Sequence, residues 1–419
     1  MTVTQCRYAV QIRRYGAEDA MKPLRVLAFV MAGGKGTRLH PFTEDYPKPA
    51  LPFGGDFRII DFALSNLYNS GVPQACVLLQ YRPLPLVHHL AVRWRGVRPG
   101  GAEFVRAITP EAACEQRFCG TADAVASGLQ SVVAEADLIA VFAADHVYRM
   151  DLRQMIEFHM RREADATVAA VPVPLERAGA FGIVCTDADS RILGFEEKPA
   201  WPGAMPGDPA RAFASMGNYL FRPDVLRAAL AGAAARGETD FGRHVLPRLV
   251  ERHRVFAYDF GRNRIPGVHR GEEPAYWRDV GTVDAYVEAQ WDLLGPEPRF
   301  RLDNPEWPIH GAAPRPPGVA DSGGFEDSII GPGARADGAA VRHSVLQGGA
   351  QVGPGAALER CIMMEGARIE GGVELRRTIV GAGNVITQRR HERLGGDAGW
   401  ARSPAGMAIV PPRSKRATA

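Results

Sequence analysis

Short apolar runs alternate with amphipathic segments through the first two thirds of the chain. Apolar residues fill the stretches 25–31, 74–79, 137–143 and 166–173, which is typical of buried strands. Apolar residues recur at helical spacing between Ile59 and Tyr68, and again in 151–162, where Asp151 is a favourable N-cap. Strands that alternate with helices predict an α/β domain with a mostly parallel sheet, which we place at residues 23–294.

The pattern changes after residue 294. Seven prolines lie between Gly295 and Pro317, which predicts an extended linker over 295–320. In 321–390, aliphatic residues recur about every six positions with small residues between them, as in 330–334, 352–356 and 369–373. Such hexapeptide repeats predict a short left-handed parallel β-helix. A flexible glycine-rich tail is the alternative, but runs such as 361–363 and 378–380 need a core in which to bury.

The two ends of the chain and its composition add little chemistry. We expect residues 1–22 to be a flexible lead and 391–419 a C-terminal tail. The formal net charge of +3 gives no support to nucleic acid or an anionic membrane as a partner. No apolar run approaches the ~20 residues that span a bilayer. The six cysteines lack metal-ligand spacing, so we expect free thiols and a cytoplasmic protein.

The most informative segment follows the first predicted strand. It runs from Ala32 to Leu39 and contains Gly33, Gly34 and Gly36, which would let backbone N–H groups approach phosphate oxygens. A helix start after the glycines would add its positive end, and Arg38 and Lys48 would add charged side chains. The spacing matches neither a Walker A loop nor the dinucleotide fingerprint. Closely spaced glycines, taken without the residues around them, are explained about equally well by a phosphate site and by a tight strand-to-helix turn.

The whole string, with Pro47-Lys48-Pro49 after it, is more specific. It resembles the signature of sugar-1-phosphate nucleotidylyltransferases, and the continuation over 53–66 resembles the ADP-glucose pyrophosphorylase family. The resemblance covers about residues 25–385. It implies a Rossmann-like nucleotidyltransferase domain followed by a left-handed β-helix, with ATP and glucose 1-phosphate as substrates, ADP-glucose for glycogen or α-glucan synthesis as product, Mg²⁺ as cofactor, and a homotetramer regulated by a small phosphorylated or carboxylate effector.

The same resemblance assigns the catalytic residues. Asp145 follows the apolar run 138–143, and Asp279 lies in the matching block 276–282. The family pairs carboxylates at these positions as Mg²⁺ ligands, although a helix cap would also explain an aspartate after a strand. Arg38 and Lys48 are assigned to stabilise charge on the phosphates. In the implied reaction glucose 1-phosphate attacks the α-phosphorus of ATP in line, and positioning and charge stabilisation carry the catalysis.

Two binding sets follow from the resemblance. The residues assigned to the nucleotide are Gly33, Gly34, Gly36, Thr37, Gln80, Gly120, Thr121 and Asp123. Those assigned to the sugar phosphate are Phe118, Gly182, Glu197, Lys198 and Ser215. Without the resemblance, a helix N-cap would explain Thr121 almost as well. Glu197 and Lys198 would then be interpreted as a solvated ion pair.

The chain departs from the family at several positions. Phe118 and Cys119 stand where the family usually has Tyr and Arg, and Ala144 replaces the usual glycine before Asp145. The loop at 45–46 lacks the basic residues that several bacterial members carry for anionic effectors, although Arg58 is kept. Two alternatives therefore remain: a nucleotidylyltransferase for another base or hexose, and a regulatory paralogue with weak catalysis. Retention of the assigned catalytic residues argues against the second.

Overall fold

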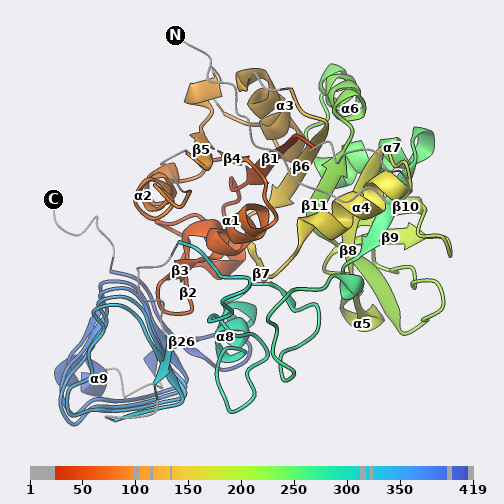
Figure 1. Ribbon diagram of the computed structural model, residues 1–419. Helices are drawn as coiled ribbons and strands as arrows, with labels where there is room; N and C mark the ends of the chain where they lie inside the picture. The colour runs from red at the N-terminus through yellow and green to blue at the C-terminus, as the bar shows by residue number, and fades with distance from the viewer. Residues whose placement is uncertain are drawn as a thin grey trace.

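The computed structural model describes residues 24–98, 103–113, 117–132, 135–311, 318–320, 324–393 and 399–413, so the lead expected at 1–22 lies outside the described residues. Figure 1 shows a mixed α/β domain, coloured red to green, beside a triangular β-helix in blue. This is the two-part architecture that the hydrophobic patterns predict. Within the described residues, no helix is long and apolar enough to cross a membrane.

A nine-stranded sheet forms the centre of the α/β domain. Its main path runs in the order β10, β9, β11, β6, β1, β4, β5, while β8 pairs with β11 and β12. The strands are β1 (Val26–Met31), β4 (Gln74–Leu78), β5 (Val105–Ile108), β6 (Leu138–Ala143), β8 (Ala166–Pro174), β9 (Gly182–Thr186), β10 (Ile192–Glu197), β11 (Arg211–Phe221) and β12 (Val255–Asp259).

The four strands predicted from apolar runs are confirmed as β1, β4, β6 and β8. From β6 to β5 the sheet is parallel, because β1 pairs in parallel with β4 and β6, and β4 with β5. Beyond β6 the sheet is mixed, since β11 runs antiparallel to β6, β8 and β9. The carboxyl ends of β1, β4 and β6 therefore meet at one edge, where ligands bind in open α/β sheets.

Helices cover the sheet, and both predicted helices are present. The helices of this domain are α1 (Ile59–Asn69), α2 (Pro83–Arg93), α3 (Thr121–Ser131), α4 (Leu152–Arg161), α5 (Leu175–Ala178), α6 (Pro223–Ala235), α7 (Leu246–Arg252) and α8 (Val283–Trp291). Asp151 caps α4 as expected, because its side chain accepts a hydrogen bond from Arg153 N at 3.0 Å. Two small antiparallel pairs complete the domain: β2 (Pro52–Phe53) with β3 (Phe57–Arg58), and β7 (His146–Tyr148) with β13 (Trp277–Asp279).

The C-terminal domain is a parallel β-helix with three faces. One face stacks β15 (Phe325–Glu326), β17 (Ala340–Arg342), β20 (Ala357–Glu359) and β23 (Glu374–Arg376), and another stacks β19 (Gln351–Val352), β22 (Arg368–Ile369) and β25 (Val385–Ile386). The third contains β14 (Gly318–Ala320), β16 (Ser328–Ile330), β18 (Val345–Leu346), β21 (Ile362–Met363), β24 (Thr378–Val380), β27 (Ala408–Val410) and β26 (Ala401–Arg402). A short helix, α9 (Gln388–Arg393), follows β25.

The structure changes the expected limits of the segments around the β-helix. The tail expected from residue 391 contains β27, which pairs in parallel with β24, so the β-helix continues to Val410. The pattern could not reveal this, because 387–407 lack the hexapeptide spacing and β27 rejoins the sheet after them. At the other end, residues 318–320 of the expected linker form β14, which pairs antiparallel with β16.

The proline-rich segment 295–311 packs against the α/β domain and is not a free spacer. Trp307 is fully buried, and its indole N–H donates to Asn66 Oδ1 of α1 at 3.3 Å. His310 N donates to Ser65 Oγ at 2.8 Å. The two domains also share one apolar cluster, in which Phe57 and Tyr286 pack with residues of the β-helix such as Ile362. The interface therefore fixes the β-helix on the α/β domain.

Candidate active site

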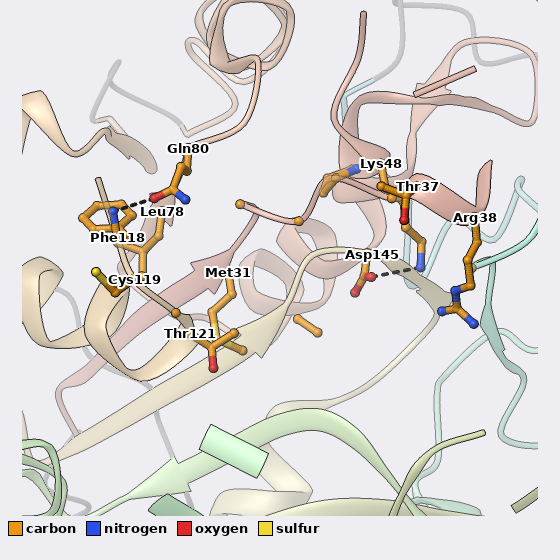
Figure 2. Close-up of a pocket in the computed structure, with 18 residues that line it drawn as sticks. Met31, Thr37, Arg38, Lys48, Leu78, Gln80, Phe118, Cys119, Thr121 and Asp145 are labelled. Atoms are coloured by element: carbon orange, nitrogen blue, oxygen red, sulfur yellow. Dashed lines mark hydrogen bonds and ion pairs between the residues drawn. The ribbon is translucent and has the colours of Figure 1, made fainter. Parts of the chain in front are cut away.

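A cleft of about 500 Å³ opens at the carboxyl ends of β1, β4 and β6. Figure 2 shows Gln80, Phe118 and Cys119 at one end of the cleft and Lys48, Asp145 and Arg38 at the other. The residues that line the cleft are Met31, Gly33, Gly34, Gly36, Thr37, Arg38, Lys48, Pro49, Leu78, Gln80, Phe118, Cys119, Gly120, Thr121, Ala124, Ala143, Asp145 and Gly281. Most of the predicted nucleotide and catalytic residues therefore come together in one place.

The glycine loop is folded tightly against the residues that follow it. Gly36 has φ +63°, and a Cβ there would lie only 2.9 Å from Lys48 Cβ, so this position requires glycine. Thr43 Oγ1 donates to Gly36 O at 2.7 Å and holds the turn. The helix start expected after the loop is only a 3-10 turn at Thr37–Leu39, so an α-helix N-terminus contributes nothing here. The glycine backbone and the nearby cations remain as the groups that could bind phosphate here.

Lys48 joins the two predicted carboxylates. Its Nζ lies 2.9 Å from Asp145 Oδ2 and 2.8 Å from Asp279 Oδ1. The side chain of Lys48 is only 7% exposed, while those of Asp145 and Asp279 are 37% and 22% exposed. Lys48 and Asp145 line the cleft, and Asp279 lies next to them. We call Lys48, Asp145 and Asp279 the inner cluster. Arg38 is exposed near Gly281 and forms no ion pair with any described residue.

Burial and charge act against each other in the inner cluster. Burial alone would lower the pKa of Lys48, but attraction to Asp145 and then Asp279 outweighs it and raises that pKa. Burial likewise opposes ionisation of Asp145, but the charge of Lys48, followed by that of His146, brings the pKa of the Asp145 carboxyl well below its ordinary value. We therefore expect Lys48 and Asp145 to carry opposite full charges at neutral pH.

Two short strands bring the carboxylates together. Asp145 lies between β6 and β7, and Asp279 is the last residue of β13. β7 pairs antiparallel with β13, and His146 stands opposite Asp279 in the register. These residues are far apart in the chain, so the sheet pairing creates the site.

The two carboxylates of the inner cluster, together with His146 beside them, fit a divalent cation. Asp145, His146 and Asp279 each offer a ligand atom, and these atoms lie within 4.8 Å of one another. That Lys48 contacts both carboxylates shows that one cation can reach both of them. His146 was not predicted from the sequence: its Nε2 lies 3.7 Å from Asp145 Oδ1, and its buried Nδ1 has no partner among the described residues. The two carboxylates supply the oxygen ligands that hard cations prefer.

The other end of the cleft contains the predicted base-contacting residues. Phe118 N donates to Gln80 Oε1 at 2.6 Å, and Cys119 N donates to Asp123 Oδ2 at 2.6 Å. Phe118 thus lies beside Gln80 and lines the cleft with the residues predicted for the nucleotide, whereas none of the other four residues predicted for the sugar phosphate lines it. The assignment rested on the motif alone, and the sequence does not reveal that Gln80 contacts this segment.

Gly120 and Thr121 attach the start of α3 to a distant loop. Gly120, and not Thr121, is the N-cap of α3, so capping does not explain Thr121. Thr121 Oγ1 accepts from Phe241 N at 3.0 Å and donates to Asp240 Oδ2 at 3.3 Å. A Cβ on Gly120 would lie 2.4 Å from Thr239 O, so the close approach needs glycine. Asp240 was not predicted from the sequence either, since an isolated aspartate before a helix suggests only a cap.

The remaining predicted sugar-phosphate residues form a second group, the outer cluster: Gly182, Glu197, Lys198 and Ser215. Gly182 pairs with Glu197 across β9 and β10, and Ser215 follows Ala214, which pairs with Ile183 across β9 and β11. Lys198 Nζ lies 3.6 Å from Glu197 Oε1, and its side chain is 54% exposed. The outer cluster therefore contains an open pair of opposite charges at the end of β10, beside Gly182 of β9 and Ser215 of β11.

Trp277 lies between the two clusters. Its ring centroid is 5.0 Å from that of His146 and 5.5 Å from that of Phe181, which precedes Gly182. Ala144, where the family usually has glycine, is fully buried in the apolar core of the domain. The methyl group of Ala144 is therefore packed against core side chains.

Comparison with known proteins matches both domains. Residues 27–295 match the nucleotidyl transferase family model, and residues 318–400 match a GlmU-like C-terminal hexapeptide model. A glucose-1-phosphate adenylyltransferase of Thermodesulfovibrio yellowstonii is 45% identical over 330 residues, covering 78% of this chain and 80% of that protein. A protein of the same name from Geobacter metallireducens is 45% identical, and the match covers 76% of this chain and 80% of that protein. Another, from Corynebacterium jeikeium, is 43% identical, and the match covers 77% of this chain and 80% of that protein.

The fold, the glycine loop and the paired carboxylates define a nucleotidyl transferase, and the chain belongs to that class. The extent and identity of the matches place it within the class: the chain belongs to the glucose-1-phosphate adenylyltransferase family. The resemblance to this family, expected over about residues 25–385, is thereby confirmed.

Proposed function

We propose that this chain is an active glucose-1-phosphate adenylyltransferase, which converts ATP and glucose 1-phosphate to ADP-glucose and pyrophosphate. The observation that carries the proposal is the inner cluster, in which Lys48 holds Asp145 and Asp279 beside the glycine loop. A subunit without chemistry would have no use for a buried lysine between two carboxylates at this sheet edge. ADP-glucose is an activated glucosyl donor, so the reaction supplies glycogen or α-glucan synthesis.

The two ends of the cleft are proposed to bind different parts of ATP. We assign the phosphates of ATP to the backbone of Gly33, Gly34 and Gly36 with Thr37 and Arg38. The glycines line the cleft, and the exposed guanidinium of Arg38 forms no ion pair with any described residue, so both suit a polyanion. The base belongs at the other end, between Gln80, Phe118 and the start of α3 at Thr121. Phe118 supplies an aromatic face, and Gln80 can both donate and accept hydrogen bonds.

We propose Mg²⁺ as the cofactor, held by Asp145 and Asp279. When bound, the ion supplies charge neutralisation to the phosphates of ATP. His146 Nε2 lies 3.7 Å from Asp145 Oδ1 and 3.9 Å from Asp279 Oδ1, and it offers a third ligand atom at the same place. Lys48 remains beside the carboxylates and is positioned to donate hydrogen bonds to phosphate oxygens.

The chain's own residues act mainly by position and charge. Lys198 and Glu197 of the outer cluster are proposed to bind the phosphate and hydroxyl groups of glucose 1-phosphate, with Gly182 and Ser215 beside them. The sugar-phosphate oxygen then attacks the α-phosphorus of ATP, and the bond to the oxygen of the leaving pyrophosphate breaks. Arg38 and Lys48 stabilise the negative charge that develops on the phosphates in this step.

Assembly and regulation are proposed from the family resemblance. We propose a cytoplasmic homotetramer that responds to a small phosphorylated or carboxylate metabolite. Arg58 lies at the interface of the two domains, where its guanidinium donates to Glu365 Oε1 at 2.6 Å and to Ala50 O at 3.0 Å. Analytical ultracentrifugation tests the tetramer, and rates with fructose 6-phosphate, fructose 1,6-bisphosphate or pyruvate test the regulation.

The activity is tested by pyrophosphate release from the purified chain with Mg²⁺ and glucose 1-phosphate. ATP, UTP, dTTP, GTP and CTP are compared, and then other hexose 1-phosphates are compared with ATP. A clear preference for ATP and glucose 1-phosphate is expected, because a site that hydrogen-bonds one base can reject others strongly. Preference for another base or hexose would support the first alternative. If a folded chain binds ATP but releases no pyrophosphate with any nucleotide, the result would support a regulatory paralogue.

A further inference from the structure

A buried amide lies directly behind the inner cluster. Asn218, on β11, has no exposed surface, and the reaction as proposed makes no use of it. A buried amide is costly unless its oxygen and nitrogen both find partners, so its position needs a reason. Its neighbours are the two strand segments on either side of Asp145.

The amide of Asn218 bridges those two segments. Ala143 N, at the end of β6, donates to Asn218 Oδ1 at 3.3 Å. Asn218 Nδ2 donates to Tyr148 Oη at 3.0 Å, at the end of β7. The orientation of the amide is determined by chemistry, because a backbone N–H can only donate and must face the amide oxygen. One side chain thus ties together both ends of the segment 143–148, in which Asp145 lies.

The backbone of β11 is shaped to bring Asn218 to this place. Ser215 pairs with Ala170 and Tyr219 pairs with Val168 on β8, so residues 216–218 leave the regular ladder in a bulge. Gly217 in this bulge has φ +71°, and a Cβ there would lie 2.9 Å from Ala143 Cβ. The bulge therefore needs a glycine beside the end of β6 and turns the next residue toward Asp145's strand.

The position of this segment decides how the carboxylates meet. β7 pairs with β13 so that His146 stands opposite Asp279 and Tyr148 opposite Trp277. Because β7 is paired with β13, a shift of residues 143–145 relative to β7 would move Asp145 relative to Asp279. Because both carboxylates contact one Lys48 Nζ within 3 Å, a small displacement would separate them.

We propose that Asn218 is a positioning residue that keeps Asp145 in register with Asp279, so that both carboxylates converge on one divalent cation. The inference rests on the proposed metal site and adds a residue that no motif points to. Residues behind a metal ligand that orient it typically change metal affinity or activity about 10–100-fold when removed.

The direct test is binding of Mn²⁺ alone to the full chain, measured from the EPR signal of free Mn²⁺. Asn218→Leu keeps the branching at Cγ and removes both hydrogen bonds. We expect Mn²⁺ to bind about 10-fold or more weakly and kcat to fall by a similar factor, while the KM for glucose 1-phosphate changes less than about threefold. Tyr148→Phe removes only one contact and is expected to show a smaller change in the same direction.

Asn263 provides a matched control. It is also buried, its Oδ1 accepts from Asp151 N at 2.9 Å, and its Nδ2 donates to Tyr258 Oη at 2.9 Å, but it contacts neither segment beside Asp145. Asn263→Leu should lower the melting temperature about as much as Asn218→Leu and leave Mn²⁺ affinity unchanged. A purely structural role of Asn218 would give the two variants the same behaviour.

The outcomes separate this inference from the proposed function. Mn²⁺ affinity within twofold of wild type in a folded Asn218→Leu variant overturns the role of Asn218, provided that Asp145→Asn abolishes binding. Binding that survives Asp145→Asn overturns the metal site itself. Should Asn218→Leu fail to fold, Tyr148→Phe decides the question, since an unchanged Mn²⁺ affinity there also contradicts the proposal.

Discussion

The inner and outer clusters carry the same kinds of charge but are built differently. In the inner cluster the side chain of Lys48 is 7% exposed and contacts two carboxylates within 3 Å. In the outer cluster the side chain of Lys198 is 54% exposed and lies 3.6 Å from one carboxylate. Charges that are already fixed cost no reorganisation during reaction, whereas an exposed lysine becomes ordered only with its ligand. The comparison supports the proposal that the inner cluster carries the chemistry and the outer one captures the substrate.

The difference has a cause in the backbone. Asp279 is carried by β13 and Asp145 precedes β7, and these strands pair with each other, while Lys48 lies in a buried turn at Lys48–Ala50. Lys198 follows the end of β10 in a left-handed backbone conformation, with φ +51°. Paired strands hold side chains in place, whereas a side chain that leaves a strand end is held by few neighbours.

The largest effect should come from removing a charge in the inner cluster. Asp145→Asn is expected to lower kcat by at least ~10²-fold, since preorganised charge is the main contribution in this kind of transfer. Steady-state pyrophosphate release measures it. Asp187, whose carboxylate only caps its own loop through Asp189 N and Arg191 N, gives the control variant Asp187→Asn. Activity of Asp145→Asn within a few-fold of the control would remove this residue from catalysis.

At the outer cluster we expect an intermediate effect, which concerns KM and not kcat. Lys198→Ala should raise the KM for glucose 1-phosphate by roughly 10-fold or more while kcat changes only a few-fold, because the lysine would bind substrate and transition state alike. Arg177→Ala, which removes an exposed cation on α5, serves as the control. A loss confined to kcat would place Lys198 with the inner cluster and break the comparison.

The smallest effect is expected at the nucleotide end of the cleft. Cys119 is exposed and lines the cleft beside Phe118, so alkylation by iodoacetamide should slow the reaction several-fold. ATP should protect against the inactivation and glucose 1-phosphate alone should not, since the outer cluster does not line this end. Cys119→Ser should be insensitive to the reagent. Equal protection by both substrates would contradict the division of the cleft.

Regular patterns in the sequence predicted the fold well. The apolar runs became β1, β4, β6 and β8, and the hexapeptide spacing became the β-helix, because burial imposes a period on the chain. The packing of 295–311 could not be predicted, since it depends on single side chains such as Trp307 that follow no period. For the same reason the continuation of the β-helix through β27 was missed.

The site was predictable where a motif carried it. The resemblance pointed to Lys48, Asp145 and Asp279, and the structure places these three in contact. His146 and Asn218 were missed, because an isolated histidine or asparagine gives no signal until a partner from another strand is known. The contact between Phe118 and Gln80 was not predicted either, because the two residues are distant in sequence.

The most direct test is a crystal structure of the chain with ADP-glucose and Mg²⁺. The account predicts that the cation is bound by carboxylate oxygens of both Asp145 and Asp279 at about 2.0–2.1 Å. It also predicts that Lys198 Nζ turns from solvent to within hydrogen-bonding distance of the phosphate attached to glucose. A cation bound away from these carboxylates, or a Lys198 that still points to solvent with the sugar in place, would contradict the assignment of the two clusters.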